Sequence, residues 1–429
     1  MKHTVTEISL GNGSKGLLVH IPDASVMTFE LNFRAGEYLL DRNKWETAHL
    51  MEHILLGANE AYPTARAFVA EVEKNGAYSN ASTSVYDINY EAECADFEWD
   101  RILGLLVLAI TKPLFLENEF NSEVGIVQEE LTTRSNNHFR HLALALREQY
   151  GMYSMTDQER LRLMSNVTVE DVRAHYLATH TTDNMRFVIA GNITTERRLA
   201  IEKILSTIEL PKGSGRRPMP EETPKSLQKP LYIEVPGVEN LYFYIDTFMS
   251  RWMRNTEIDA LSLANIMLTE TSHSRIYGTG REKGLLYHMN SFYTRWQYGS
   301  NWWFGAQILP QNTRQLFDII TREITGIRQG HMSDEDIVAA KQHALGRFQR
   351  SAQTVGGTGN GYSMRYFFDD VIEDYYEVPK RLEAVTKEQM ISVTNDLFSE
   401  GIRGFGVLGT CGEEFAQDCF SHIKGLWNT

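Results

Sequence analysis

Three residues that could bind and use a metal ion stand close together near the N-terminus of the sequence. Residues 45–57, WETAHLMEHILLG, contain His49, Glu52 and His53. On an α-helix, residues i, i+3 and i+4 share one face, so these three side chains are expected to project into the same small volume. Two neutral imidazoles four residues apart can bind one divalent ion, most often zinc, and the carboxylate between them is left free to act as a base.

The same pattern has a plainer interpretation, which further residues must exclude. A histidine on an apolar helix with Leu50, Ile54 and Leu55 is usually a buried residue with a hydrogen-bond partner. A chain with 13 histidines also produces this pattern by chance in roughly a few per cent of cases. A metal site therefore requires a third ligand and a segment that holds the substrate.

A candidate third ligand lies in residues 117–135, which we expect to be helical. Glu123 and Glu130 are two helical turns apart, so they lie on the same side of this helix, next to the apolar residues Ile126 and Val127. A carboxylate near apolar neighbours needs a partner, and a metal ion would supply one. The alternative is that these glutamates form a solvated acidic face, which is the commoner outcome for a run of charges.

Composition limits the class of protein. A chain of 429 residues favours two domains, and 42% apolar with 23% charged residues is typical of a folded soluble protein. The net charge of −14 argues against nucleic acid or an anionic membrane as a partner. Cys94, Cys411 and Cys419 are too few for a disulfide framework. With no signal-peptide pattern and no transmembrane run in the sequence, we expect a cytoplasmic protein.

Periodicity along the chain predicts two similar halves. Residues 78–94 alternate between apolar and polar, as does an antiparallel strand with one buried face. A proline-rich and glycine-rich stretch at residues 212–227 reads as a linker between domains 1–211 and 228–429. The second half repeats the order of strands and helices of the first, which indicates a duplication. Residues 356–361, GGTGNG, are interpreted as a flexible loop.

The motifs resemble those of the family that contains pitrilysin, insulysin and the mitochondrial processing peptidases, which are inverted zincins with the order H-x-x-E-H. The resemblance rests on HLMEH at 49–53, EVGIVQEEL at 123–131 and GAYSNASTS at 76–84. It implies a zinc-dependent metalloendopeptidase with an α+β fold, in which each of two duplicated domains is a mainly antiparallel sheet covered by helices on one face. It assigns zinc ligation to His49, His53 and Glu130, general-base catalysis to Glu52, support to Glu123, and substrate contact to Asn80 and Ala81. Glu129 competes with Glu130, but only Glu130 shares a helix face with Glu123.

The second half is expected to have a different task, because the helix predicted near residues 257–268 contains no histidine. Residues 274–287, SRIYGTGREKGLLY, resemble a family segment whose arginine and tyrosine reach the scissile peptide, which points to Arg281 and Tyr287. The spacing after Arg281 is one residue shorter than the family pattern. The resemblance implies peptide substrates, one zinc ion per subunit and an enclosed chamber formed by a homodimer. A heterodimer with a zinc-less paralogue, a non-catalytic accessory subunit and a structural zinc site are the alternatives.

Overall fold

The computed structural model describes residues 1–427, which form two compact units. Unit 1 consists of residues 1–132, 158–220 and 349–375, and unit 2 consists of residues 133–157, 221–348 and the segment that begins at 376. The predicted domains 1–211 and 228–429 account for most of each unit. Residues 133–157 and 349–375, however, each belong to the unit built mainly from the other half of the chain.

Unit 1 is built around a six-stranded sheet in the order β1-β2-β6-β3-β5-β4. Its strands are β1 (Thr4–Ser9), β2 (Lys15–His20), β3 (Val26–Phe33), β4 (Tyr78–Thr83), β5 (Ile88–Ala95) and β6 (Met185–Gly191). Only the β2–β6 pair is parallel. The stretch with period-two alternation is a hairpin of β4 and β5, in which Ile88, Tyr90 and Ala92 are buried. This hairpin leaves β4 at the edge of the sheet.

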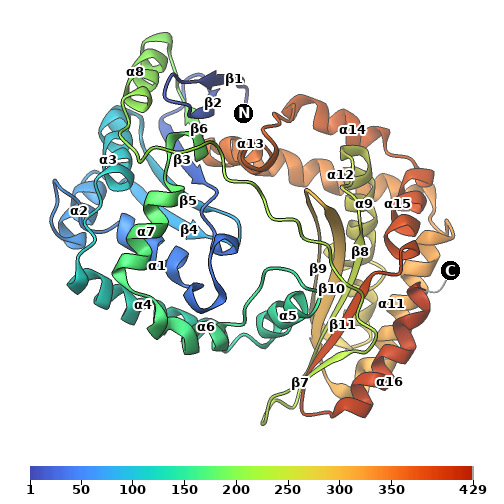
Figure 1. Cartoon of the computed structure of the whole chain (residues 1–429). Coiled ribbons are helices and arrows are strands. Elements are labelled where there is room, and N and C mark those ends of the chain that lie inside the picture. The colour runs from blue at the N-terminus through green and yellow to red at the C-terminus, as the bar shows by residue number, and fades with distance from the viewer. Residues whose placement is uncertain (428–429) are drawn as a thin grey trace. The chain divides into compact units, whose positions relative to one another are not determined.

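Helices cover the core face of this sheet (Figure 1). They are α1 (Thr47–Leu55), α2 (Ala65–Glu73), α3 (Trp99–Thr111), α4 (Glu117–Ser135), α6 (Asp157–Leu163), α7 (Val169–Thr179) and α8 (Thr195–Ser206). Phe29, Leu31 and Phe187 from the strands pack with Leu50 of α1 and Leu103 of α3 in one buried cluster. Threonine side chains cap the starts of α2, α7 and α8: the hydroxyl of Thr168, for example, accepts a hydrogen bond from the third residue of α7.

Unit 2 repeats this plan with one strand fewer. Its sheet has the order β7-β11-β8-β10-β9, and β7–β11 is its parallel pair. The strands are β7 (Leu231–Glu234), β8 (Leu241–Met249), β9 (Leu286–Trp296), β10 (Gly299–Ile308) and β11 (Arg403–Gly409). The helices are α5 (His138–Gln149), α9 (Asn255–Asn265), α10 (Tyr277–Glu282), α11 (Thr313–Arg328), α12 (Asp334–Ser351), α14 (Val378–Ala384), α15 (Lys387–Ser399) and α16 (Glu413–Ile423). Nowhere in residues 1–427 is a helix both long enough and apolar enough to cross a membrane.

The two segments that cross the predicted domain boundary each supply a helix to the second face of a sheet. In unit 1, α13 (Val355–Asp369) packs on β6 and β3, where Tyr362 and Tyr366 join a small cluster with Val188. In unit 2, α5 packs on β8 and β11 through Leu142 and Leu146. The α+β class with two mainly antiparallel sheets and covering helices is confirmed, and these two helices add cover on the opposite faces.

The glycine-rich residues 356–361 form part of helix α13, so the prediction of a flexible loop is wrong. Thr354 caps the start of the helix, and its hydroxyl accepts a hydrogen bond from the backbone N–H of Gly357. Glycine has a packing role at one point of this helix, because a Cβ atom added at Gly359 would lie 3.1 Å from the Cβ atom of Ala190 on β6. Close approach of helix and sheet therefore outweighs the low helix propensity of glycine.

Candidate metal centre

Helix α1 presents the two histidines of the predicted metal site. Its residues Leu50, Met51 and Leu55 are fully buried, so the helix is held in place by the core of unit 1. The side chain of His49 is 5% exposed and that of His53 is 20% exposed. One helical turn separates the two histidines, and their ring centroids are 5.1 Å apart.

Helix α4 brings Glu130 to these imidazoles. Its Oε2 atom lies 3.3 Å from Nε2 of His49 and 3.7 Å from Nε2 of His53. One ligand atom from each of the three residues lies within 4.8 Å of the other two, which is the geometry of a group that could hold a metal ion. Glu129 is exposed to solvent and is not part of this group. The structure thus brings together the three residues that the sequence proposed as ligands.

Each histidine has a second carboxylate behind it. Oε2 of Glu123 lies 2.9 Å from Nδ1 of His53, and Oε2 of Glu46 lies 3.1 Å from Nδ1 of His49. An ionised carboxylate can only accept a hydrogen bond, so Nδ1 of each histidine is the donor. The Nε2 atom of each ring faces Glu130. Carboxylates in this position commonly orient the histidine ligands of a metal ion.

Sequence reasoning identified Glu123 but missed Glu46. Glu46 is 1% exposed and accepts hydrogen bonds from both Nε and Nη2 of Arg160 on α6. Nη2 of Arg160 also lies 3.3 Å from Oε1 of Glu37, in the short 3-10 helix Glu37–Leu39. The position of Glu46 three residues before His49 was a usable signal, because such residues are neighbours on a helix. Arg160 is distant in sequence and gave no local signal.

The electrostatics of the group suit a cation. Burial lowers the pKa of His53, but hydrogen bonds with Glu123 and Glu130 outweigh this effect and raise the pKa to about 9. Burial also opposes protonation of His49, and hydrogen bonds with Glu130 and Glu46 raise its pKa nonetheless. The carboxylates therefore favour positive charge at both rings, where a metal ion would take the place of protons.

The donor set fits zinc in number and type. Two imidazole nitrogens and one carboxylate oxygen are a common zinc-binding set, and three protein ligands leave one coordination position for water or substrate. Glu130 is 30% exposed, so the group is accessible from solvent. Glu52 is half-buried on the same helix and is not among the three grouped residues.

The strand that is predicted to contact the substrate, β4, lies next to helix α1, which carries the two histidines. Asn80 and Ala81 belong to β4, which is in contact with α1. Asn80 is exposed, whereas Ala81 is 8% exposed and packs in the core. Because β4 pairs with β5 on one side only, its other edge presents backbone donors and acceptors that can pair with an extended chain.

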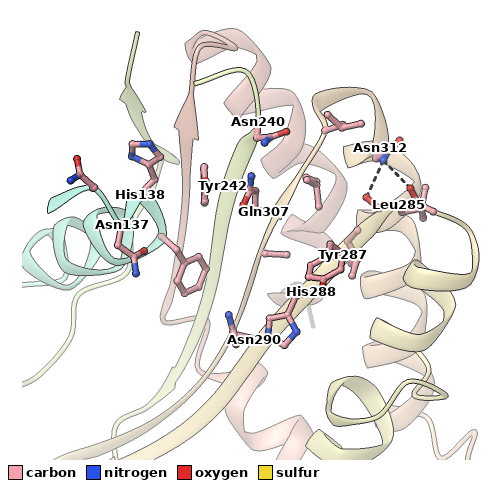
Figure 2. A pocket seen from close by; sticks show the side chains of 17 residues that line it. Asn137, His138, Asn240, Tyr242, Leu285, Tyr287, His288, Asn290, Gln307 and Asn312 are labelled. Carbon is pink, nitrogen blue, oxygen red and sulfur yellow. Dashed lines mark hydrogen bonds between the residues drawn. The ribbon is translucent and has the colours of Figure 1, made fainter. Parts of the chain in front are cut away.

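Arg281 and Tyr287 lie together in unit 2. Nη1 of Arg281 on α10 donates to the backbone carbonyl of Tyr287 at 2.8 Å, and its guanidinium carbon is 5.1 Å from the centre of the tyrosine ring. The side chain of Tyr287, at the start of β9, is 82% exposed. It lines a pocket of about 720 Å³ opposite Asn137 and His138, and none of the described residues around this pocket is Asp, Glu, Lys or Arg (Figure 2).

Solved structures share this two-unit fold. The chain superposes on a protease from Helicobacter pylori with a TM-score of 0.82, covering 95% of this chain and 100% of the other at 16% identity. It also superposes on a peptidase M16 inactive domain from Pseudomonas fluorescens with a TM-score of 0.80, covering 95% and 98% of the two chains at 16% identity. At this level of identity the similarity establishes the fold.

Sequence comparison identifies the family. Residues 17–159 match the model of insulinase, peptidase family M16, and residues 166–343 match the model of the peptidase M16 inactive domain. The chain belongs to peptidase family M16, a family of metallopeptidases.

Curated relatives match over a short stretch. The chain is 28% identical to insulin-degrading enzyme of Drosophila melanogaster over 123 residues, which are 29% of this chain and 12% of that enzyme. It is 25% identical to insulin-degrading enzyme-like 2 of Arabidopsis thaliana over 129 residues, which are 30% of this chain and 13% of that protein. The match therefore spans about an eighth of each of these larger relatives.

Proposed function

We propose that this chain is a zinc-dependent endopeptidase that cleaves peptides or small unfolded polypeptides. The observation that carries the proposal is the convergence of ligand atoms from His49, His53 and Glu130 within 4.8 Å. Membership of the M16 family supports peptide-bond hydrolysis as the reaction. A structural zinc site is disfavoured, because such sites are closed by four protein ligands, and this group has three.

The residues of the chain divide the chemistry among them. His49, His53 and Glu130 would hold zinc, which supplies a Lewis acid and lowers the pKa of water to about 7 when it is bound. Glu52 accepts the proton of the attacking water and then delivers it to the leaving amine. Glu123 keeps the ring of His53 oriented through Nδ1.

The free edge of β4 is proposed to bind the substrate as an added strand. Backbone pairing gives affinity for an extended segment without selecting particular side chains, and Asn80 can contact the substrate from its exposed position. This mode favours unfolded or short chains, because a folded protein has few unpaired extended segments to offer. Arg281 and Tyr287 are proposed to contact the scissile peptide, with the tyrosine hydroxyl donating a hydrogen bond to the developing oxyanion.

We propose a homodimer in the cytoplasm that encloses two sites in one chamber. Each chain carries both the metal-binding group and the Arg281–Tyr287 pair, so two identical chains have every part that is needed. The proposed location rests on the sequence, in which three scattered cysteines are too few for a disulfide framework. The match of residues 166–343 to an inactive-domain model favours a second candidate, an accessory subunit that pairs with another M16 chain.

One experiment separates these functions. The purified chain and its His49→Ala variant are assayed for zinc content and for cleavage of a quenched fluorogenic peptide, with and without a chelator, and their masses are measured by sedimentation. The endopeptidase requires one zinc per chain, chelator-sensitive cleavage, and loss of both in the variant. A chain that binds zinc but cleaves nothing alone is the accessory subunit. Equal zinc content in both proteins contradicts the ligand assignment, and a fully active monomer contradicts the dimer.

A further inference from the structure

We infer that Glu46, clamped by Arg160, is a positioning residue that fixes the ring of His49 for metal binding. The inference rests on the proposed zinc site and concerns a carboxylate outside its ligand set. Glu46 touches neither Glu130 nor any other residue of the metal-binding group except His49 in the contacts of the described structure. Its effect on a metal ion must therefore act through the imidazole.

The geometry of the contact selects one orientation of the ring. Oε2 of Glu46 lies 3.1 Å from Nδ1 of His49, while Nε2 on the other side of the ring lies 3.3 Å from Oε2 of Glu130. Rotation of the ring by half a turn would break the hydrogen bond from Nδ1 to Glu46. Loss of a hydrogen bond to a buried carboxylate is unfavourable. The contact thus holds Nε2 toward the ligand group and keeps the proton on Nδ1.

Arg160 makes this contact rigid. The guanidinium donates from Nε and Nη2 to both oxygens of Glu46, in the two-point geometry that fixes a carboxylate most firmly. Side-chain exposure is 1% for Glu46 and 9% for Arg160, so water does not weaken these bonds. A carboxylate held in this way cannot move with the imidazole if the ring of His49 rotates. Rotation therefore breaks the hydrogen bond between Nδ1 and Glu46.

The second histidine of the site lacks such a clamp. Its partner Glu123 is 16% exposed, and no arginine or lysine is paired with that carboxylate among the ion pairs of the described residues. The two imidazoles therefore have different kinds of partner. His53 contacts a partly exposed carboxylate, whereas His49 contacts a buried carboxylate that is paired with an arginine. Loss of charge at Glu46 is expected to disturb the metal site although the residue is not a ligand.

The test compares Glu46→Gln with a matched control, Glu98→Gln. Glu98 is also a buried glutamate paired with an arginine in unit 1, since its side chain is 3% exposed and bonded to Arg101, but no histidine touches it. Zinc affinity is measured by chelator competition, the cobalt-substituted proteins are compared by absorption spectroscopy, and thermal unfolding of the metal-free proteins reports general damage. Ring order of His49 in the metal-free proteins is measured by relaxation of ¹³C-labelled histidine.

Glu46→Gln is expected to bind zinc about 10- to 100-fold more weakly, to shift the cobalt spectrum and to loosen the ring of His49. Glu98→Gln is expected to lose thermal stability and to keep the zinc affinity, spectrum and ring order of the parent chain. Unchanged zinc affinity and ring order in Glu46→Gln would overturn the inference while leaving the metal site intact. A parent chain without zinc affinity would instead reject the proposed function, and the ring order would still decide the role of Glu46.

Discussion

Nε2 of His49 lies 3.3 Å from Oε2 of Glu130, and this contact joins helix α1 to helix α4 at the candidate metal site. Without a metal, the imidazole and the carboxylate can share a proton, so the group forms an ion pair of its own. The protein's own contacts therefore hold the three candidate ligand atoms within 4.8 Å of one another. Because these residues come together without a metal, we expect activity to require the metal ion and folding not to require it.

The metal-free chain is expected to stay folded but inactive. Leu50, Met51 and Leu55 anchor α1 in the core independently of the metal group. Zinc at about 1,000 times its dissociation constant adds on the order of 4 kcal/mol to the free energy of unfolding. Circular dichroism of the chelated protein should match that of the zinc-bound protein, with a lower Tm and full recovery of activity on adding zinc. Loss of helical signal on chelation would show that zinc is needed for folding.

Replacing Glu52 by glutamine should abolish peptide cleavage without removing the metal. Glu52 lies outside the group of possible ligands, and the amide cannot accept the proton of the attacking water. We expect a loss of roughly 10²- to 10⁴-fold in kcat, with unchanged zinc content by mass spectrometry. Glu129→Gln, at an exposed position of α4, makes the same chemical change and should retain activity. Wild-type activity in Glu52→Gln would remove this residue from the mechanism.

Tyr287→Phe should lower kcat while leaving KM nearly unchanged, because a hydrogen bond to the oxyanion forms only in the transition state. We expect a loss of about 10²-fold in kcat against a fluorogenic peptide. Tyr376→Phe is the matched control, since Tyr376 is also an exposed tyrosine of unit 2, with 49% exposure. A rise in KM alone would make Tyr287 a binding residue.

Local patterns predicted much of the fold and the ligand group, and tertiary contacts account for what they missed. Helix α4 occupies the predicted residues 117–135, and the alternating residues 78–94 form most of the β4–β5 hairpin. The candidate ligands His49 and His53 were recognisable because a four-residue spacing on a helix is a local property, and the family resemblance added Glu130. Arg160 could not be predicted, because its partner Glu46 is far away in sequence.

The glycine-rich helix is a second case in which a tertiary contact, and not the local sequence, decides the structure. Its composition indicated a loop, yet α13 packs on β6 at Gly359. Gly359→Leu should therefore destabilise the chain by about 1–3 kcal/mol or more, because the side chain meets Ala190 and must displace the helix. Gly361→Leu is the control, since an added Cβ there has no neighbour within 4 Å and leucine favours the helix. Urea denaturation should rank Gly359→Leu well below the control, and equal stabilities would contradict the close approach.

The stability of the chain should fall at mildly acidic pH because of a buried histidine on α7, a helix that packs against α1. Burial of His175 on α7 lowers its pKa to about 4, although Nε2 donates a hydrogen bond to the backbone carbonyl of Ala35 at 2.8 Å. In the unfolded chain the pKa is about 6.5, so protons bind the unfolded state first as the pH falls. The contribution of the neutral imidazole is therefore complete above about pH 6.5 and is lost progressively toward pH 4.

This loss amounts to on the order of 3 kcal/mol, from a pKa difference of about 2.5 units at 1.36 kcal/mol each. His175→Gln keeps a donor for the carbonyl of Ala35 but does not titrate. Urea denaturation of the metal-free proteins between pH 7 and pH 4.5 should show a steeper loss of stability in the parent chain than in the variant. Carboxylates that titrate in both proteins cancel in this comparison. Parallel curves would show that His175 takes up its proton equally in the folded and unfolded states.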